Sequence, residues 1–420
     1  MATAAISDPR TARQEEILDT KKTTCCIVGG GPGGMLLAIL LARKGVPVTV
    51  LEAHKDFDRE FRGDTIHPSA LEVLDEIGLS ERLHEIRHVK VYGPTLRAAN
   101  GNFTPMDFRN LKTRFPYIML IPQTKFLDFI AAEAGKYPEF RLVMTANVES
   151  LVKEDGAVRG VRYLGKDGCH EVRAALTVGA DGRFSKVRHL AGIEPVKTSA
   201  PMDILWFRLP HLPEDEQSDR FMGGFGMGRV LAVFDRYDHW QVGYVFPKGT
   251  YAQLRAAGVE ALRKSIVAIE PRLARHVESL TEWSDCSLLS VESSRCPVWY
   301  KPGLLLIGDA AHVMSPVGGV GINYAMMDAV AASNLLSAPL QSGRVTVEDL
   351  ARVQKEREWP TRVIQRIQAT VQNRVVARVL QSQTEMRIPW TVRLFFKIPF
   401  LKNTVARILG FGVRPEHVEN

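Results

Sequence analysis

The chain has 420 residues, of which 45% are hydrophobic and 24% charged, a composition that is ordinary for a globular protein. At roughly 150 residues per domain, this length predicts two or three domains, and the composition excludes a disordered, collagen-like or disulfide-stapled chain. The net charge of +7 is unevenly distributed. Residues 351–420 hold 13 Lys and Arg against 5 Asp and Glu, whereas the rest holds 41 against 42. The excess positive charge therefore belongs to the C-terminal sixth of the chain.

Targeting segments and metal motifs are not recognisable in the sequence. The N-terminal residues MATAAISDPRTARQEE have neither the basic nor the apolar region of a signal peptide, and the apolar run from Met35 to Ala42 is far shorter than a membrane span. The five cysteines are odd in number and scattered, which predicts reduced thiols in a cytoplasmic protein. Because CxxC, HExxH, P-loop and GxSxG patterns are all missing, we expect no metal site and no serine nucleophile.

A glycine cluster lies between two predicted strands. The run CCIVGG predicts a buried strand, MLLAILLA a helix and PVTVLE a second strand, all within residues 25–52. The GxGxxG spacing falls on Gly29, Gly31 and Gly34. These glycines permit a tight turn, a close approach of the backbone to a pyrophosphate, and close packing of helix on strand, while Glu52 can accept hydrogen bonds from ribose hydroxyls. This unit predicts a dinucleotide site but does not choose between NAD and FAD.

Two later signatures make the choice. In LTVGADGRFSKVR (176–188) an apolar strand leads to Asp181, and in LLLIGDAAHVMSPVGGVGIN (304–323) another leads to Asp309. A carboxylate at a strand end can bind a ribitol hydroxyl. The glycines after it expose N–H groups at a helix N-terminus, which suit a group that gains negative charge, such as a reduced flavin.

These three signatures, in this order, resemble those of the flavoprotein monooxygenases related to p-hydroxybenzoate hydroxylase and the ubiquinone-biosynthesis hydroxylases. The resemblance spans about residues 23–345. It implies an α/β fold in which a Rossmann-like FAD-binding domain carries an inserted, mostly antiparallel β-sheet substrate domain and is followed by a C-terminal helical tail. It also implies FAD as the cofactor. No second complete GxGxxG unit exists in the sequence, so NAD(P)H is expected to bind transiently at the surface.

Further matches to the family occur at FRGDTIHPSALEVLDEIGL (61–79), IPQTKFLDFIAAEA (121–134) and the TANVESL segment. The resemblance then implies that FAD contacts Gly29, Gly31, Gly33, Gly34, Glu52, Ala53, Arg62, Gln123, Val148, Asp181, Asp309, Gly321, Ile322 and Asn323. It implies catalytic positions at Arg62, Pro316 and Gly318. Two alternatives remain open: Arg62 could form a surface ion pair, and Asp181 could cap the helix that begins near Ser185. We expect His312 to be structural and His67 to be as suited to packing as to the flavin.

The predicted domains are discontinuous. We expect a polar tail at 1–22, an FAD-binding domain at 23–90, 120–190 and 296–345, a substrate domain at 91–119 and 191–295, and a basic helical region at 346–420. In that last region, the Trp-Pro pair at 359–360 is expected to start a helix. The substrate domain contains stretches that alternate apolar and polar residues, as a sheet with one buried face does. Its aromatic residues Trp206, Trp240, Tyr244 and Phe246 are candidates for the pocket wall, although aromatic residues at this spacing are more often core.

The resemblance implies a single-component monooxygenase. NAD(P)H would reduce FAD, O2 would add at flavin C4a, and the hydroperoxide would hydroxylate an aromatic, phenolic or quinone-like, lipophilic substrate. The segment GYVFPKG (243–249) loosely resembles a motif of geranylgeranyl reductases, so a reductase of the same fold is one alternative. A non-catalytic flavin- or lipid-binding protein at a membrane surface is another, suggested by the basic tail.

The tail segment IPWTVRLFFKIPFL (388–401), which KNTVARILGFGVRP follows, interleaves aromatic and basic residues. Such a stretch either lies at a membrane interface or caps the pocket mouth, and we favour the cap. Pro389 and Pro399 argue against one long membrane helix. No nucleic-acid-binding module is recognisable, and we expect a monomer or a homodimer.

Overall fold

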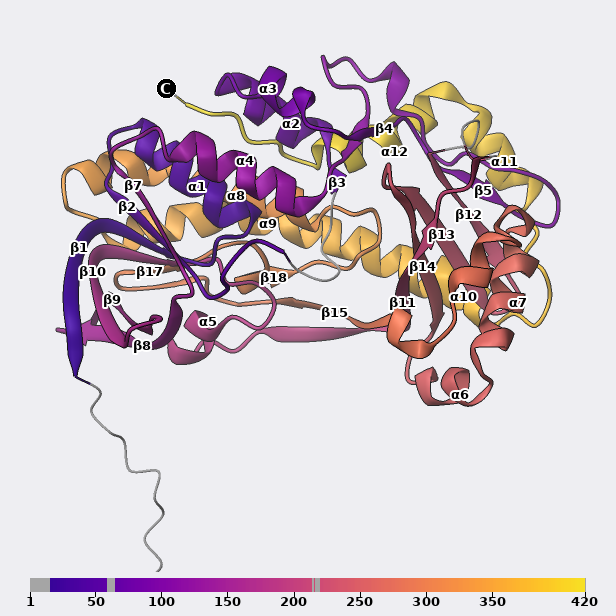
Figure 1. Ribbon diagram of the computed structural model, residues 1–420. Helices are drawn as coiled ribbons and strands as arrows, with labels where there is room; N and C mark the ends of the chain where they lie inside the picture. Colours follow the sequence, from indigo (N-terminus) through magenta and orange to yellow (C-terminus); the bar gives the residue numbers. More distant parts are fainter. Residues whose placement is uncertain (1–15, 59–64, 214, 216–219, 420) are drawn as a thin grey trace, which may run out of the picture.

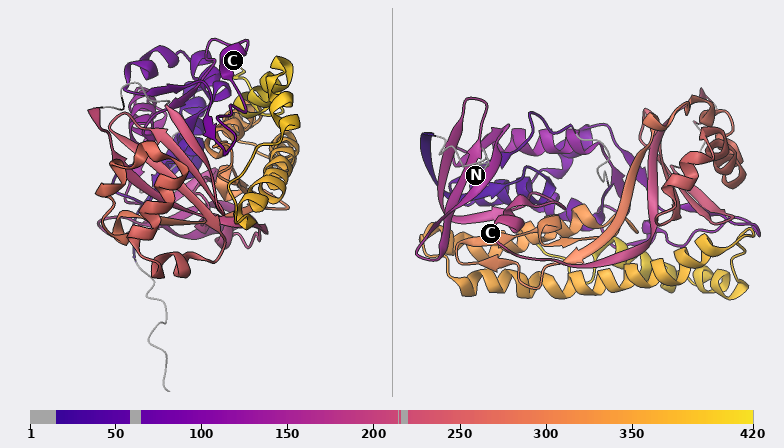
Figure 2. Two further views of the ribbon diagram at one scale, coloured as in Figure 1. Left: turned by 90° about the vertical axis from the view of Figure 1, so that its right-hand side faces the viewer. Right: turned by 90° about the horizontal axis from the view of Figure 1, so that it is seen from below.

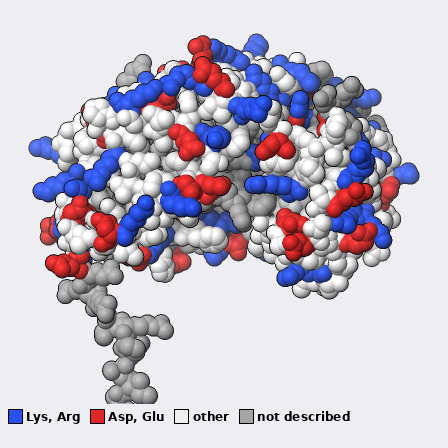
Figure 3. Space-filling view, viewed as in Figure 1, with Lys and Arg blue, Asp and Glu red and all other residues white. Residues whose placement is uncertain are grey.

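The computed structural model describes residues 16–58, 65–213, 215 and 220–419 of the chain (Figure 1). Two sheets lie next to each other, and helices from the C-terminal region run along both (Figures 1 and 2). The predicted fold class, a Rossmann-like domain with an inserted, mostly antiparallel sheet and a helical C-terminal region, is confirmed. Basic and acidic side chains are intermixed on the face shown in Figure 3.

The larger sheet is built on strands that are buried on both faces. Its order is β16-β17-β10-β1-β2-β7, and β17, β10, β1, β2 and β7 run parallel, while β9 and β8 continue from β10 as an antiparallel hairpin. Cys25 and Ile27 pack under helices on one face, and Cys26 and Val28 pack on the other. This two-sided burial explains why the run CCIV is apolar throughout.

The strands of this sheet are β1 (Ile17–Val28), β2 (Val48–Glu52), β7 (Phe140–Met144), β8 (Asn147–Glu154), β9 (Ala157–Leu164), β10 (Cys169–Gly179), β16 (Tyr300–Lys301) and β17 (Leu304–Leu306). The helices that pack on it are α1 (Pro32–Arg43), α4 (Gln123–Ala134), α5 (Lys186–Leu190) and α8 (Gly321–Gln341). All five cysteines are free thiols.

The first strand begins earlier than the sequence predicted. Residues 17–22, which we expected in a polar tail, pair with β10 from Cys169 onward. Most of these residues are exposed or half-buried, so the main-chain ladder holds them rather than an apolar face. Apolar patterning gave no signal for such a segment.

The second sheet has the order β18-β15-β11-β14-β13-β12-β5 and is antiparallel except between β12 and β5. One face packs on helix α7, and the opposite face borders a cavity. Its elements are β5 (Thr95–Arg97), β11 (Val196–Pro210), β12 (Phe221–Gly226), β13 (Arg229–Asp235), β14 (His239–Pro247), β15 (Ser287–Arg295), β18 (His312–Val313), α6 (Tyr251–Ala256) and α7 (Val259–Ile269).

A small sheet of order β3-β6-β4 joins the two parts. The remaining elements of the first half are β3 (Thr65–Ile66), β4 (Val89–Val91), β6 (Ile118–Leu120), α2 (Pro68–Glu76) and α3 (Ser80–Glu85). Short 3-10 turns occur at η1 (Phe108–Asn110), η3 (Pro271–Leu273), η4 (His276–Ser279), η5 (Trp283–Asp285) and η6 (Gly308–Ala310).

The C-terminal region is helical, as predicted, but one helix starts elsewhere. It consists of α9 (Val347–Val371), a π-helical turn η7 (Gln372–Val376), α10 (Ala377–Gln381), α11 (Trp390–Lys397) and α12 (Pro399–Phe411). The prediction that a helix starts at the Trp-Pro pair is wrong. A capping box of Thr346 and Asp349 starts α9. The helix continues through Pro360, which belongs to a buried face together with Arg357, Thr361 and Ile364. Among the described residues, no helix is both long and apolar enough to cross a bilayer.

Candidate active site

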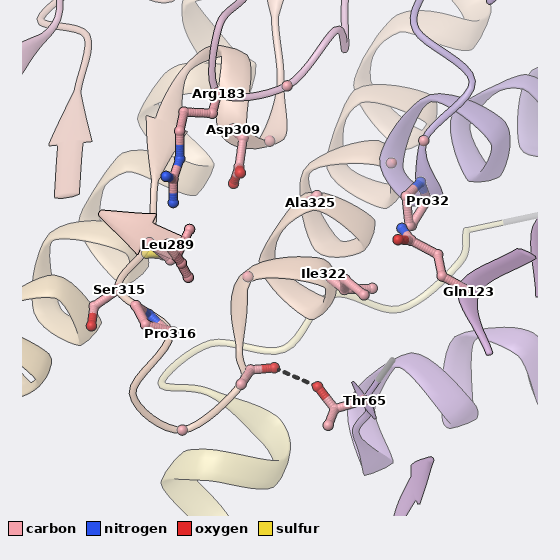
Figure 4. A pocket seen from close by; sticks show the side chains of 18 of the residues that line it. Pro32, Thr65, Gln123, Arg183, Leu289, Asp309, Ser315, Pro316, Ile322 and Ala325 are labelled. Atoms are coloured by element: carbon pink, nitrogen blue, oxygen red, sulfur yellow. Dashed lines mark hydrogen bonds between the residues drawn. The ribbon is translucent and has the colours of Figure 1, made fainter. Parts of the chain in front are cut away.

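A cavity of about 790 Å³ lies between the two sheets (Figure 4). Its walls come from the glycine turn after β1, the strand ends of the larger sheet, the loop before α8 and the open face of the second sheet. Ligand sites in proteins are typically clefts of about 300–1,000 Å³. The three sequence signatures, far apart along the chain, all reach this one cavity.

The glycine turn leaves a cradle open at the N-terminus of α1. A Cβ on Gly29, whose φ is +108°, would lie 2.4 Å from the carbonyl oxygen of Ala180, and one on Gly34 would lie 2.1 Å from the carbonyl oxygen of Gly29. A Cβ on Gly31 would meet nothing within 4 Å, since this residue faces the cavity. No side chain caps this end of α1. Its backbone N–H groups are therefore positioned to bind an anion such as a pyrophosphate.

Gly33 lines the cavity and also sets the spacing of two helices. A Cβ at this position would lie 2.9 Å from the carbonyl oxygen of Ala325 in α8. Gln123, at the start of α4, lines the same part of the cavity, and Figure 4 shows its side chain near Pro32.

Glu52 is held in place at the end of β2. One carboxylate oxygen accepts a hydrogen bond from the backbone N–H of Gly30 at 2.9 Å. The other accepts from the N–H of His54 at 3.1 Å and lies 2.6 Å from Nδ1 of its ring. Glu52, Ala53 and Val148 all line the cavity, so the end predicted to hold the adenosine is formed by β2 and β8. His54 belongs to no motif that the sequence shows, so this contact was not predicted.

Asp181 caps α5, which was one of its two predicted roles. Its carboxylate accepts hydrogen bonds from the Ser185 hydroxyl and, at 3.0 Å, from the N–H of Val187. Burial raises the pKa of Asp181 above its usual value. The residue also lines the cavity, so the cap and a ligand role are compatible.

The guanidinium of Arg188 links the second and third signatures. It donates to the carbonyl oxygen of Ala310 at 3.0 Å and to that of Arg183 at 2.9 Å. The loops that carry Asp181 and Asp309 are thereby fixed to each other. The side chains of Arg183 and Asp309 both extend into the cavity (Figure 4).

A buried carboxylate that sequence reasoning missed holds the third signature. Asp328 in α8 accepts from the N–H of Gly308 at 2.9 Å, lies 2.6 Å from Nε2 of His312 and accepts from Nε of Arg357 at 3.1 Å. Burial alone would raise the pKa of Asp328, but His312 and Arg357 outweigh it and hold the pKa below its usual value. Arg357 also donates to Glu416 at 2.9 Å. His312 is thus structural, as predicted.

The loop before α8 forms one wall of the cavity through Pro316 and Gly318, and the first turn of α8 extends it through Gly321 and Ile322. The carbonyl oxygen of Gly319 accepts from the Thr65 hydroxyl at 2.9 Å (Figure 4). The loop is held from behind by helix α9, since Gln368 donates to the carbonyl oxygens of Ser315 and Val317 at 2.9 and 2.8 Å.

Asn323 and His67 are tied to each other next to this loop. The side-chain oxygen of Asn323 accepts from the N–H of His67 at 2.8 Å, and Asn323 is not among the residues that line the cavity. The His67 ring is buried, and its Nδ1 lies 2.8 Å from the carbonyl oxygen of Leu409. Burial lowers the pKa of His67 to about 4, so the ring packs as a neutral group.

The prediction that Trp240, Tyr244 and Phe246 line the pocket is wrong. All three are buried on the opposite face of the second sheet, in the core that packs on α7. Because successive strand residues point to opposite faces, it is the intervening residues of β14, at 241, 243 and 245, that border the cavity.

Trp206 on β11 does line the cavity, as predicted. The wall around it is largely apolar and includes Met202, Ile204, Val230, Phe234, Val245 and Leu289. Gln241 and Arg236 add polar groups, and burial lowers the pKa of Arg236 to about 10.

Arg62, predicted to contact the flavin, lies outside the described residues.

Most of the chain matches one known protein family. The family described as "FAD binding domain" matches residues 22–367. The chain belongs to this FAD-binding family of class A flavin monooxygenases. A relative from Streptomyces rimosus, 6-methylpretetramide 4-monooxygenase, is 33% identical over 374 residues, which cover 89% of this chain and 88% of the relative.

Two further similarities are weaker. A digeranylgeranylglycerophospholipid reductase of Thermoplasma volcanium is 25% identical over 284 residues, which cover 65% of this chain and 66% of that protein. The crystal structure of p-nitrophenol 4-monooxygenase from Pseudomonas putida matches with a TM-score of 0.77 at 21% identity and covers 94% of this chain and all of the other, which shows a shared fold.

The residues present fit FAD, the cofactor of this family. The open cradle at Gly31 suits the pyrophosphate, because a side chain there would fill the space that a phosphate needs. Glu52 suits the adenosine ribose, and the uncapped N-terminus of α8 suits an electron-rich ring edge. The predictions of recognition, enzyme class and FAD as cofactor are confirmed by the family match.

Proposed function

We propose that this FAD-dependent monooxygenase uses NAD(P)H and O2 to hydroxylate an extended, lipophilic aromatic or phenolic substrate. The observation that carries the proposal is the apolar face of the second sheet, which lines the same cavity as the loop of Pro316 and Gly318. The relative named 6-methylpretetramide 4-monooxygenase supports an aromatic substrate. The redox chemistry, hydride uptake from NAD(P)H and oxygen transfer from O2, is supplied by bound FAD.

The residues of this chain would bind FAD and hold it in a fixed orientation. The N-terminus of α1 would bind the pyrophosphate through backbone N–H groups, Glu52 would hold the ribose, and the loops of Asp181 and Asp309 would hold the ribitol side. The N–H groups at the start of α8 would stabilise negative charge on the ring edge.

The second sheet contributes the substrate wall. Its apolar side chains, with Trp206 among them, favour a flat apolar ring and exclude water from the oxygen-transfer step. Leu409 of α12 closes the cavity beside Gly318, where a Cβ would lie 3.3 Å from Cδ1 of Leu409. This placement supports the predicted cap, because α12 covers the loop that faces the substrate.

O2 consumption measured with purified, FAD-loaded protein tests the proposal. In the presence of NADH or NADPH, addition of a fitting phenol from a panel of one- to four-ring compounds should stimulate O2 uptake. With ¹⁸O2, the product should gain one labelled oxygen. An alternative with a specific basis is a prenyl reductase, given the relative from Thermoplasma volcanium.

The outcomes separate the candidates. If saturation of a prenyl double bond proceeds anaerobically while no aromatic compound stimulates O2 uptake, the reductase is correct and the hydroxylase is wrong. A protein that binds FAD but oxidises NAD(P)H with neither class of substrate would support the non-catalytic alternative.

A further inference from the structure

Helices α11 and α12 expose a cluster of large apolar side chains on the outside of the molecule. Trp390 and Phe400 are 75% and 76% exposed, and Leu394, Phe395 and Ile398 are exposed between them. We call these five residues the α11–α12 patch. Figures 1 and 2 place both helices at the outer edge of the molecule. Contiguous exposed apolar surface on a globular protein marks an interaction site.

The patch is the free side of a helix whose other side is fixed. Phe396 packs edge-on against Phe103, with ring centroids 5.1 Å apart. Arg393 donates to Asn100 at 3.1 Å and to the carbonyl oxygen of Gly101 at 2.8 Å. Helix α11 therefore rests on the loop after β5, and its apolar outer face is presented to solvent by a defined structure.

Both helices present apolar and basic residues on one exposed face. On α11 this face carries Trp390, Leu394 and Lys397, and on α12 it carries Phe400 and Arg407, at spacings of three, four and seven residues. All five are exposed. The break at Pro399 keeps the two helices short and separate.

The charge around the patch has one sign. Residues 386–415 contain six Lys and Arg and no Asp or Glu. A second copy of the chain docked by a two-fold axis would bring these charges against each other, since the same surface meets itself. An anionic lipid surface offers both an apolar layer and the opposite charge.

We infer that the α11–α12 patch binds an anionic lipid bilayer, with both helices lying in the interface. This inference concerns a surface outside the cavity and does not depend on which substrate is hydroxylated. It has a consequence for access, because α12 reaches the cavity through Leu409. The bound orientation would hold the wall beside Gly318 close to the lipid, where a lipophilic substrate concentrates.

Vesicle flotation with the full-length, FAD-loaded protein tests the inference. The protein should float with vesicles of equal parts phosphatidylcholine and phosphatidylglycerol at low ionic strength, and much less with phosphatidylcholine alone or at high salt. The Trp390→Ser, Phe400→Ser double variant should lose flotation. The Lys397→Gln and Arg407→Gln variants should each weaken binding by about fivefold, and by about 25-fold together.

Matched controls lie outside the patch. Trp359→Ser removes an exposed tryptophan from α9, and Lys264→Gln removes an exposed lysine from α7. Both should float as the wild type does. Bound-flavin absorbance of every variant shows whether its fold is retained. If the apolar double variant loses FAD, flotation of the Lys397→Gln and Arg407→Gln variants tests the inference in its place.

Three results would overturn the inference. The wild type could remain unbound with anionic vesicles at low salt. The apolar double variant and the two charge variants could float as well as the controls. A dimer seen by light scattering, dissociated by the patch variants and indifferent to vesicles, would assign the patch to self-association instead.

Discussion

Two neighbouring glycines of the first turn should separate cofactor binding from folding. Gly31→Ala places a methyl group in the open cradle, where it meets no protein atom within 4 Å. The backbone of Gly31 is at φ −74° and ψ 177°, which alanine adopts without strain. The cost to stability should therefore be at most about 1 kcal/mol, from the poorer N-cap. Gly34→Ala places its methyl group 2.1 Å from the carbonyl oxygen of Gly29.

The two variants should therefore fail in different ways. In Gly31→Ala the methyl group should displace the pyrophosphate from backbone donors, and loss of one charge-assisted hydrogen bond is worth about 1.5–3 kcal/mol. We expect FAD affinity to fall by about 10- to 100-fold. In Gly34→Ala the backbone must move, and overpacking of this kind costs about 1–3 kcal/mol, partly offset by the helix preference of alanine.

The assay is a pair of measurements on each purified apoprotein. Quenching of flavin fluorescence gives the FAD dissociation constant, and urea unfolding gives the free energy of unfolding. If Gly31→Ala binds FAD as tightly as the wild type, the pyrophosphate does not lie against this turn. If Gly34→Ala unfolds like the wild type, the close contact with Gly29 is misjudged.

Three further predictions concern other parts of the structure. Asp328→Ala leaves a buried guanidinium with one carboxylate and should cost about 3–5 kcal/mol in urea unfolding, whereas Glu416→Gln, which keeps an acceptor, should cost less than half of that. Burial lowers the pKa of His67 from 6.5 to about 4, so below about pH 6.5 the unfolded chain binds a proton that the folded chain does not. The free energy of unfolding should therefore be unaffected by His67 above pH 6.5 and fall by about 3 kcal/mol in total as the pH drops to 4. His67→Asn should flatten this part of the stability profile between pH 7 and 5, and an unchanged slope would contradict the assignment. Trp206→Leu should change KM or the product pattern, while Trp240→Leu should lower the unfolding temperature and leave KM unchanged; equal effects on KM would refute the assignment of the two faces.

The parts of the site that sequence analysis predicted are those formed by short stretches of chain. The turn at Gly29 and the acid at Glu52 belong to one strand-helix-strand unit, so local spacing determines their arrangement. Asp328 and Arg357 were missed because they lie on different helices and meet only in the folded protein. The sequence does show Asp328 as a charged residue within an apolar helix, but it does not show which residues contact it.

The wrong prediction of which face of β14 lines the cavity also arose because local sequence does not show what a residue meets in the fold. Alternation tells which residues share a face but does not tell which face meets a ligand. The bulky aromatic residues of β14, which suit either role, fill the core against α7. The better signal was Gly243 in the middle of a strand, since a missing side chain there leaves room for a close neighbour. Trp206 occupies that room, and a Cβ on Gly243 would lie 2.9 Å from its ring.

The end of the chain is part of the site although the family match stops at residue 367. Gln368 holds the cavity-lining loop before α8, Leu409 covers that loop at Gly318, and Glu416 pairs with the arginine that anchors α8. The positive charge that stood out in the composition therefore lies on the segment that closes the cavity. Because Leu409 and Gln368 contact the loop of Pro316 and Gly318, we expect the choice of substrate and the route by which it enters to depend on residues 368–419 more than on the glycine turn.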